Sequence, residues 1–133
     1  MGPKENVACR WFEEFWNRKD EDAVHRLATP DMVGHGPEGT LRTGADFVAF
    51  RAALTGALPD LHVEVKHCVE GRDMVAVQWV ARGTHTGHAM GAPTGRHIEV
   101  PGLTLVRVVD GKCAEGWDDY DAVGLMRQLG AAV

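Results

Sequence analysis

The sequence predicts an α+β fold in which N-terminal helices pack on a strongly bent antiparallel sheet to form a cone-shaped α+β barrel. Before Pro59, apolar residues recur at the three- and four-residue spacing of amphipathic helices. After Pro59, they alternate with polar residues at every second position, as in strands with one buried face. We expect a pocket between the helices and the concave side of the sheet, where small-molecule sites commonly lie.

Three helices are expected in the first part of the chain. The first runs from about Glu5 to about Arg18 and gathers its aromatic residues on one face. Asp20 is the expected N-cap of a short second helix, which Pro30 ends. Thr43 begins the third helix, which ends at Pro59. All three helices contribute apolar faces to the core.

Four strands and a short final helix are expected after Pro59. The alternating segments cover residues 61–70, 75–85, 98–109 and 112–119. Pro101-Gly102 indicates a bulge or bend, and Asp110-Gly111 is a tight hairpin signal. Val123 and Leu129 belong to the final helix. The length of 133 residues predicts one domain, residues 1–133.

Composition and charge exclude several classes of partner. The formal net charge of −5 disfavours a nucleic-acid surface, so we expect no nucleic acid among the partners. No apolar run approaches the roughly 20 residues of a spanning helix, which excludes a membrane-spanning helix. Residues 1–5 lack the hydrophobic segment of a signal peptide, which predicts a cytoplasmic protein. Cys9, Cys68 and Cys113 are expected to be free thiols in that reducing compartment.

Strand parity selects one acidic residue for chemistry. On the last predicted strand, Ala114, Gly116 and Asp118 share a face, and the two small residues leave open volume beside the carboxyl group. The opposite face carries Cys113, Glu115, Trp117 and Asp119. Burial can raise a carboxyl pKa into the range where it transfers protons. Asp118 is therefore the candidate general acid/base, unless it caps the following helix or pairs with an arginine.

Other polar and aromatic side chains are candidates for the same pocket. His35 could orient a substrate carbonyl or hold the carboxylate partner, or be a turn residue. His85 shares a strand face with Trp79 and could face the ligand or be hydrogen-bonded core. Tyr120 could place its hydroxyl in the pocket or cover its rim. Asp121 begins the last helix, where a carboxylate is also favoured by the helix dipole.

The strand opposite Asp118 and the loop before it carry two further expectations. Gly102, Thr104 and Val106 are expected to face Asp118, and they offer few hydrogen-bonding groups. Large apolar groups on the outer face, including Leu103 and Leu105, would be exposed in a monomer and predict a homodimer. The loop 87–95 is either a rim or lid over the pocket or an ordinary connection.

Taken together, the landmarks of this chain resemble the SnoaL-like polyketide cyclases of the nuclear transport factor 2-like superfamily. The resemblance covers nearly the whole chain. Its motifs are His35 with Gly44, Leu58-Pro59-Asp60-Leu61, Gly83-Thr84-His85-Thr86-Gly87, Pro93-Thr94-Gly95-Arg96, Asp110-Gly111-Lys112, the segment 115–118 and Gln128-Leu129-Gly130. It departs from many relatives at Gly116, where they carry a histidine or another polar residue.

The resemblance implies a cone fold, commonly homodimeric, that closes a ring by intramolecular aldol condensation without a metal or cofactor. It matches Asp118 to the general acid/base, with His35 as the second candidate catalytic residue. The candidate substrate-binding residues are His85, Trp79, Tyr120, Asp121 and Thr104. The expected ligand is small and apolar or polyketide-like. The alternatives are a non-catalytic ligand-binding module, or an isomerase, dehydratase or epoxide hydrolase on the same scaffold.

Overall fold

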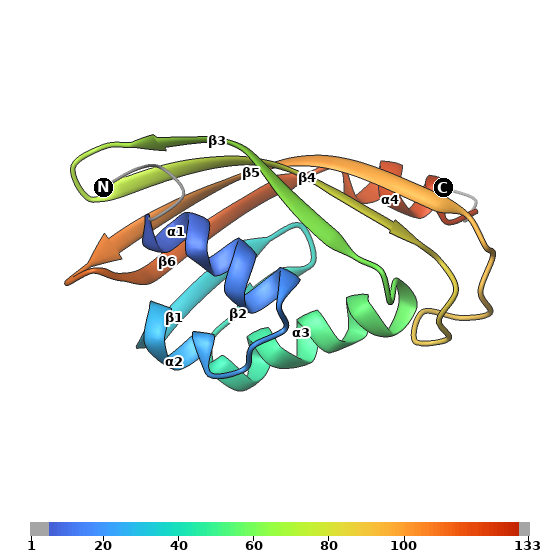
Figure 1. Ribbon diagram of the computed structural model, residues 1–133, viewed down its shortest axis with the longest axis horizontal. Coiled ribbons are helices and arrows are strands. Elements are labelled where there is room, and N and C mark those ends of the chain that lie inside the picture. Colours follow the sequence, from blue (N-terminus) through green and yellow to red (C-terminus); the bar gives the residue numbers. More distant parts are fainter. Residues whose placement is uncertain (1–5, 131–133) are drawn as a thin grey trace.

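A computed structural model describes residues 6–130 (Figure 1). Its helical elements are α1 (Val7–Arg10), the π-helix η2 (Trp11–Asn17), α2 (Ala23–Leu27), α3 (Gly44–Ala57) and α4 (Ala122–Gln128). Its strands are β1 (Ala28–Gly36), β2 (Gly39–Leu41), β3 (His62–Glu70), β4 (Met74–Thr84), β5 (His97–Val109) and β6 (Lys112–Tyr120). The α+β fold class is confirmed.

The six strands form one curled, unclosed sheet in the order β2-β1-β6-β5-β4-β3. In Figure 1 the sheet arches over α1, α2 and α3, which lie together beneath its concave side. Every neighbouring pair is antiparallel except β1 and β6, which run parallel. The expected sheet was antiparallel throughout, and this pair makes it mixed. The hydrophobic core lies between the helices and the concave side of the sheet.

The N-terminal helix consists of α1 and η2 without interruption. Asn6 caps its start by accepting a hydrogen bond from the backbone N–H of Ala8, and the predicted start at Glu5 lies outside the described residues. Beyond Arg10 the helix widens, and the Arg18 N–H bonds to the carbonyl of Glu13, five residues back. The aromatic residues of this helix are buried or half-buried against the sheet, as their spacing predicts.

The caps of the next two helices agree with the sequence in part. Asp22, rather than Asp20, occupies the N-cap position of α2, although its side chain makes no capping hydrogen bond. The Asp20 carboxylate, two residues earlier, accepts from the Asp22 N–H. Thr43 caps α3 by accepting from the Asp46 N–H, as expected. The Asp46 carboxylate accepts from the Arg42 N–H and does not complete a capping box with Thr43.

Two strands between α2 and α3 were not expected. α2 ends at Leu27, three residues before Pro30, which lies within β1 and does not end the helix as predicted. β1 then turns back into the short strand β2. The sequence of β1 contains two glycines and a proline, residue types that disfavour strands locally. β1 pairs most extensively with β6, which is far away along the chain. His35 of β1 and Glu115 of β6, for example, are 80 residues apart. The strand β1 therefore forms because of its tertiary contact with β6, and the local sequence does not predict it.

Bulges change which residues face the core on two strands. The register shifts between Arg107 and Val108 of β5, where β6 contains one extra residue. Cys113 consequently faces inward and is 1% exposed, which corrects its predicted place on the outer face. A shift between Val65 and His67 of β3 likewise turns the His67 ring outward, where it bonds to Gln78.

The cysteines also differ from expectation. Cys9 on α1 and Cys68 on β3 form a disulfide, which ties the N-terminal helix to the edge strand. Cys113 is the free cysteine and is buried. The prediction of three free thiols is wrong, because it rested on sequence separation, whereas the fold brings residues 9 and 68 together. The thiols therefore give no argument for a reducing compartment.

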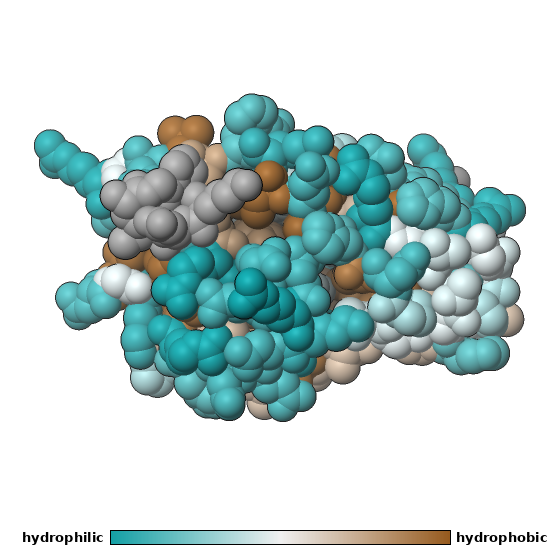
Figure 2. Space-filling model, viewed as in Figure 1, coloured by the Kyte–Doolittle hydropathy of each residue, from teal (hydrophilic) through white to brown (hydrophobic). Residues whose placement is uncertain are grey.

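The surface view taken in the same orientation shows mainly hydrophilic side chains over the helices, with hydrophobic groups in the gaps between them (Figure 2). α3 is the longest described helix, with 14 residues. None of the helices in the described part of the chain is long and apolar enough to cross a membrane.

Candidate active site

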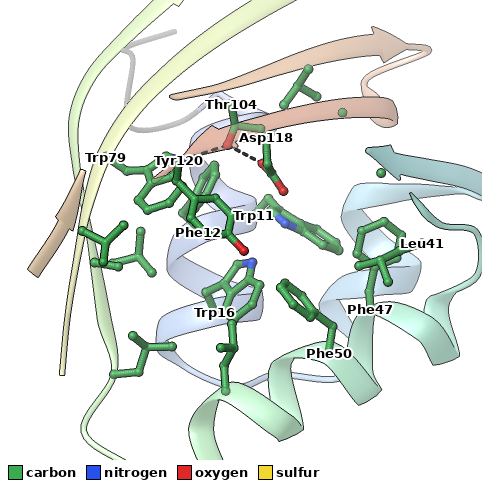
Figure 3. A pocket seen from close by; sticks show the side chains of 18 of the residues that line it. Trp11, Phe12, Trp16, Leu41, Phe47, Phe50, Trp79, Thr104, Asp118 and Tyr120 are labelled. Carbon is green, nitrogen blue, oxygen red and sulfur yellow. Dashed lines mark hydrogen bonds between the residues drawn. The ribbon is translucent and has the colours of Figure 1, made fainter. Parts of the chain in front are cut away.

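The main cavity lies between the helices and the concave side of the sheet, where the sequence predicts it. It has a volume of about 110 Å³. Aromatic rings from η2 and α3 form one side, and the inner faces of β4, β5 and β6 form the other (Figure 3). The labelled wall residues in Figure 3 are Trp11, Phe12, Trp16, Leu41, Phe47, Phe50, Trp79, Thr104, Asp118 and Tyr120. The wall is overwhelmingly apolar.

Asp118 projects into this cavity from β6, between β1 and β5. Gly116, two residues earlier on the same face, is buried and lines the cavity without filling it. Gly36 of β1 lies on the other side of the carboxyl group, where a Cβ would come within 3.8 Å of the Asp118 Cβ. Strand parity predicts the open space at Ala114 and Gly116. In the structure it is provided by Gly116 and by Gly36, which was not predicted.

A chain of two hydrogen bonds ends on Asp118. The indole Nε1–H of Trp79 donates to the Thr104 hydroxyl oxygen over 2.8 Å. The Thr104 hydroxyl donates in turn to Oδ1 of Asp118 over 2.5 Å, a length typical of a bond to an ionised acceptor. Figure 3 shows the second carboxylate oxygen pointing into the cavity. One oxygen of Asp118 is thus held, and the other faces a ligand.

The surroundings of Asp118 raise the pKa of its carboxyl group. The largest cause is desolvation by the surrounding protein. The hydrogen bond from Thr104 lowers the pKa, and the negative charge of Glu38 raises it further. Asp118 nevertheless keeps open surface, because it lines both this cavity and the smaller one beside it. A raised pKa brings a carboxyl group closer to the pH at which general acid/base catalysis is efficient.

The smaller cavity, about 80 Å³, lies under the β1–β2 hairpin and meets the main cavity at Asp118. We call it the vestibule. Its wall contains polar side chains, among them His35, Glu38 and Thr40, which contrasts with the apolar main cavity. Asp118 thus stands between an apolar chamber and a polar one.

The His35 side chain bonds to Glu115 and does not form a catalytic pair with Asp118. Its Nε2 lies 2.7 Å from a carboxylate oxygen of Glu115, and its ring stacks on Trp117 at a centroid distance of 5.7 Å. Arg107 holds the other oxygen of Glu115 at 2.9 Å. Both Glu115 and Trp117 face the outer side of β6. His35 therefore belongs to an outer cluster and reaches only the vestibule wall.

The structure brings together Asp118, Thr104, Trp79 and Tyr120, and it places two other candidates elsewhere. His85 follows the end of β4, is 2% exposed, and accepts hydrogen bonds at Nδ1 from the backbone and side chain of Thr94. Asp121 is the N-cap of α4 and accepts from the Gly124 N–H over 2.8 Å. Neither residue lines the main cavity or the vestibule.

The loop 87–95 packs on the C-terminal end of α3. The Gly87 N–H bonds to the carbonyl of Ala57 over 3.0 Å, and a Cβ on Gly56 would press on Ala89. His85 holds the returning segment through Thr94. None of these loop residues lines either cavity, so the loop forms no part of the cavity wall in this structure.

Two features of the site were missed from the sequence. Glu38, whose charge acts on Asp118, lies in the turn between β1 and β2 and gave no signal because neither strand was expected. The aromatic residues of η2, including Trp11 and Trp16, are predicted mainly as core, with a ligand-facing role for one of them as the alternative, and three of them form the cavity wall. Helical spacing identifies an inward face but cannot tell a filled interior from a hollow one.

No three histidine, cysteine, aspartate or glutamate side chains within residues 6–130 are arranged to hold a metal ion.

Comparisons with known proteins agree with this geometry. Two curated relatives match over 98% of this chain: the aklanonic acid methyl ester cyclases DauD of Streptomyces sp. (strain C5), 31% identical over 83% of its length, and DnrD of Streptomyces peucetius, 34% identical over 92%. The crystal structure of IdmH from Streptomyces antibioticus, assigned as a polyketide cyclase, is 33% identical with a TM-score of 0.83, covering 98% of this chain and 100% of that one. Residues 6–129 match the family described as SnoaL-like polyketide cyclase. The chain belongs to that family, and its cone-shaped fold is the one its relatives share.

Proposed function

We propose that this protein closes a ring in an uncharged polyketide-derived substrate by intramolecular aldol addition, with Asp118 as the general acid/base. The observation that carries the proposal is the position of Asp118. Among the described residues it is the one Asp, Glu, Lys, Arg or His side chain on the wall of an otherwise apolar, aromatic cavity. The names of the two curated relatives support the same reaction class.

The composition of the wall supports an uncharged substrate. The described residues of the main cavity include no lysine, arginine or histidine that would neutralise a carboxylate. A free carboxylate would also meet the negative charge of Asp118 in a poorly solvated space. An ester or a ketone meets neither penalty. The aromatic rings of Trp11, Trp16 and Phe50 offer faces on which a flat ring system can stack.

The reaction needs one group that takes a proton and later returns it. Ionised Asp118 removes a proton from a carbon flanked by carbonyl groups, and the resulting carbanion attacks a second carbonyl of the same molecule. A carbon–carbon bond forms, the carbonyl electron pair moves to oxygen, and protonated Asp118 returns its proton to that alkoxide. The product is an isomer of the substrate. Acid/base catalysis contributes about 10²–10⁴-fold, and holding the chain folded for attack contributes further.

Aklanonic acid methyl ester, named for the two relatives, is the first compound to test. Turnover is followed by chromatography and mass spectrometry, since ring closure gives a new retention time at unchanged mass. Asp118→Asn keeps the shape of the side chain and removes the base, so we expect turnover to fall by about 10²-fold or more. Asp119→Asn is the matched control, because Asp119 is exposed on the opposite face of the same strand.

Unchanged turnover in a folded Asp118→Asn variant would contradict the proposed mechanism. A ligand-binding module gives a different result: the compound binds to both the native protein and Asp118→Asn, and neither converts it.

We also propose that the protein is a homodimer that covers the outer face of β5. Leu103, Leu105 and Val109 are 48%, 40% and 44% exposed there. Trp117 of β6 pairs with Leu105 in register and extends the same face. A second copy of the chain would remove this apolar surface from water.

A further inference from the structure

The candidate active site contains two buried side chains on the cavity wall that also control how Asp118 is held. Trp79 is 8% exposed and Thr104 is 5% exposed. They come from neighbouring strands, β4 and β5, and together they form the hydrogen-bonded chain that ends on Oδ1 of Asp118. The sequence predicts both only as substrate-binding residues.

The direction of each hydrogen bond follows from the chemistry of the groups. An indole N–H can donate but cannot accept. Thr104 must therefore accept from Trp79, and the single hydroxyl proton of Thr104 is left for Asp118. Without the indole, the hydroxyl group could rotate toward another acceptor. Trp79 thus orients the Thr104 hydroxyl, and Thr104 orients the carboxylate.

The backbone of β5 is adapted to the indole ring. Gly102 pairs with Trp79 in register, and a Cβ on Gly102 would overlap the six-membered part of the Trp79 ring. Because that position has no side chain, the ring lies across the strand and its Nε1 reaches Thr104, two residues further along β5. Gly102 is therefore part of the same arrangement.

We infer that Trp79 and Thr104 are positioning residues that hold Oδ1 of Asp118 as a fixed hydrogen-bond acceptor and leave Oδ2 as the oxygen that exchanges protons with the substrate, an assignment that rests on the proposed function. Oδ1 already faces a hydroxyl proton, so a proton taken from the substrate is carried by Oδ2. Figure 3 shows that oxygen directed into the cavity. The same atom then takes the proton from carbon and returns it to the new alkoxide.

Other titratable groups near the carboxyl group are few in the described part of the chain. Glu38 faces it from the β1–β2 turn and is the charged neighbour that raises its pKa. His35 lines the vestibule but is bonded to Glu115. Cys113, from β6, and Tyr120 also line the main cavity. Burial raises the pKa of Cys113 to about 12, so its thiol stays neutral at the pH values of interest.

The test is a titration of the Asp118 carboxyl group by carbon-13 NMR, which requires no substrate. Thr104→Val keeps the shape of the side chain and removes the hydroxyl group that stabilises the ionised form. We expect the titration midpoint of Asp118 to rise by about one pH unit. Thr104→Ser restores the hydroxyl group and should return the midpoint most of the way to its native value.

Trp79→Phe tests whether the indole acts through Thr104. It should raise the midpoint by a smaller amount in the native background and by nothing further when combined with Thr104→Val. Trp16→Phe is the matched control, since Trp16 lines the same cavity and makes no hydrogen bond to Thr104. The control should leave the midpoint where it is. If Trp79→Phe does not fold, the two Thr104 variants still decide the role of the hydroxyl group.

An unchanged midpoint in Thr104→Val, or an equal effect of Trp79→Phe with and without the Thr104 hydroxyl group, would overturn the positioning role. Turnover gives the second readout. The acid limb of the pH–rate profile should move to higher pH by the same amount as the titration midpoint. A protein that titrates as expected but closes no ring contradicts the proposed function, whereas a turning-over enzyme with an unmoved midpoint contradicts the positioning role.

Discussion

Gly36 lies directly across from Asp118, so close that a Cβ on Gly36 would stand 3.8 Å from the Asp118 Cβ. The same Cβ would stand 3.4 Å from a carboxylate oxygen of Glu38. Both distances are ordinary contacts, so an alanine fits there, whereas a branched side chain would bring further atoms into the space beside the carboxyl group. The absence of a side chain at position 36 keeps the vestibule open to the main cavity beside the carboxyl group.

Gly36→Val should therefore impair catalysis while the fold persists. The branched side chain occupies the space beside Asp118 and displaces either the carboxyl group or the substrate, and we expect kcat/KM to fall by about tenfold or more. Gly36→Ala, which adds one methyl group at van der Waals distance, should retain most of the activity. Steady-state kinetics with thermal unfolding as the folding control checks this. Native turnover in Gly36→Val would show that the space is not used.

The raised pKa of Asp118 predicts a dependence of stability on pH. The folded chain holds this proton more tightly than the unfolded chain, so ionisation of Asp118 opposes folding. The destabilisation is absent below the unfolded pKa of about 3.9 and complete above the raised folded pKa. Asp118→Asn should therefore unfold at a higher temperature than the native protein at pH 8, with the difference vanishing near pH 3.5. A variant that is less stable at pH 8 would contradict this.

The charge of Glu38 should influence the pH at which the acid limb of the pH–rate profile lies. Its negative charge raises the pKa of Asp118, so Glu38→Gln should lower that pKa and move the acid limb of the pH–rate profile to lower pH. Glu13→Gln is a suitable control, since Glu13 is exposed on η2 and lines neither cavity. An acid limb that stays in place, or moves to higher pH, would show that another group sets it.

The cysteine pairing makes a prediction about thiol counts. With Cys9 and Cys68 joined, the protein unfolded in denaturant without reductant should show one reactive thiol, Cys113. The folded protein should show none at pH 8, because burial raises the pKa of Cys113 to about 12. Reduction should lower stability by about 4 kcal/mol, given the 59-residue separation. Three reactive thiols without reductant would mean that the bond is absent.

A charged substitution tests whether the outer face of β5 is the proposed dimer interface. Leu105→Lys places a charge in the exposed apolar surface and should convert the proposed dimer to a monomer without unfolding it. Sedimentation velocity at micromolar concentration separates the two species. Met126→Lys is the control, since Met126 is 38% exposed on α4 and lies away from this face. A native protein that sediments as a monomer would remove the dimer from consideration.

Much of the fold could be predicted because its signals are local. The cap at Thr43 and the hairpin at Asp110-Gly111 each depend on neighbours within a few residues, and both are present. The alternation along β4 also holds, since Val75, Val77 and Trp79 are all buried. What could not be predicted depends on distant partners. The strand character of β1 comes from β6, and the inward position of Cys113 comes from a register shift against β5.

The candidate site divides in the same way. Asp118 and Thr104 were identified because parity on two neighbouring strands places both on the concave side. His35 and His85 were predicted as pocket residues. Hydrogen bonds to Glu115 and Thr94, respectively, hold them outside the wall of the main cavity. A histidine has two nitrogen atoms that need partners, and the sequence does not say which polar neighbours satisfy them.

The parallel pairing of β1 with β6 has a consequence for how the chain acquires its shape. β6 is the last strand to be synthesised, and it must insert between β1 and β5, closing a loop of 80 residues between His35 and Glu115. Closing a long loop is entropically unfavourable, and contacts distant in sequence form late. The β1–β2 hairpin therefore lacks its partner strand β6 until the C-terminal part of the chain has folded. Asp118 enters with that same strand, so the step that completes the sheet also delivers the carboxyl group to its cavity.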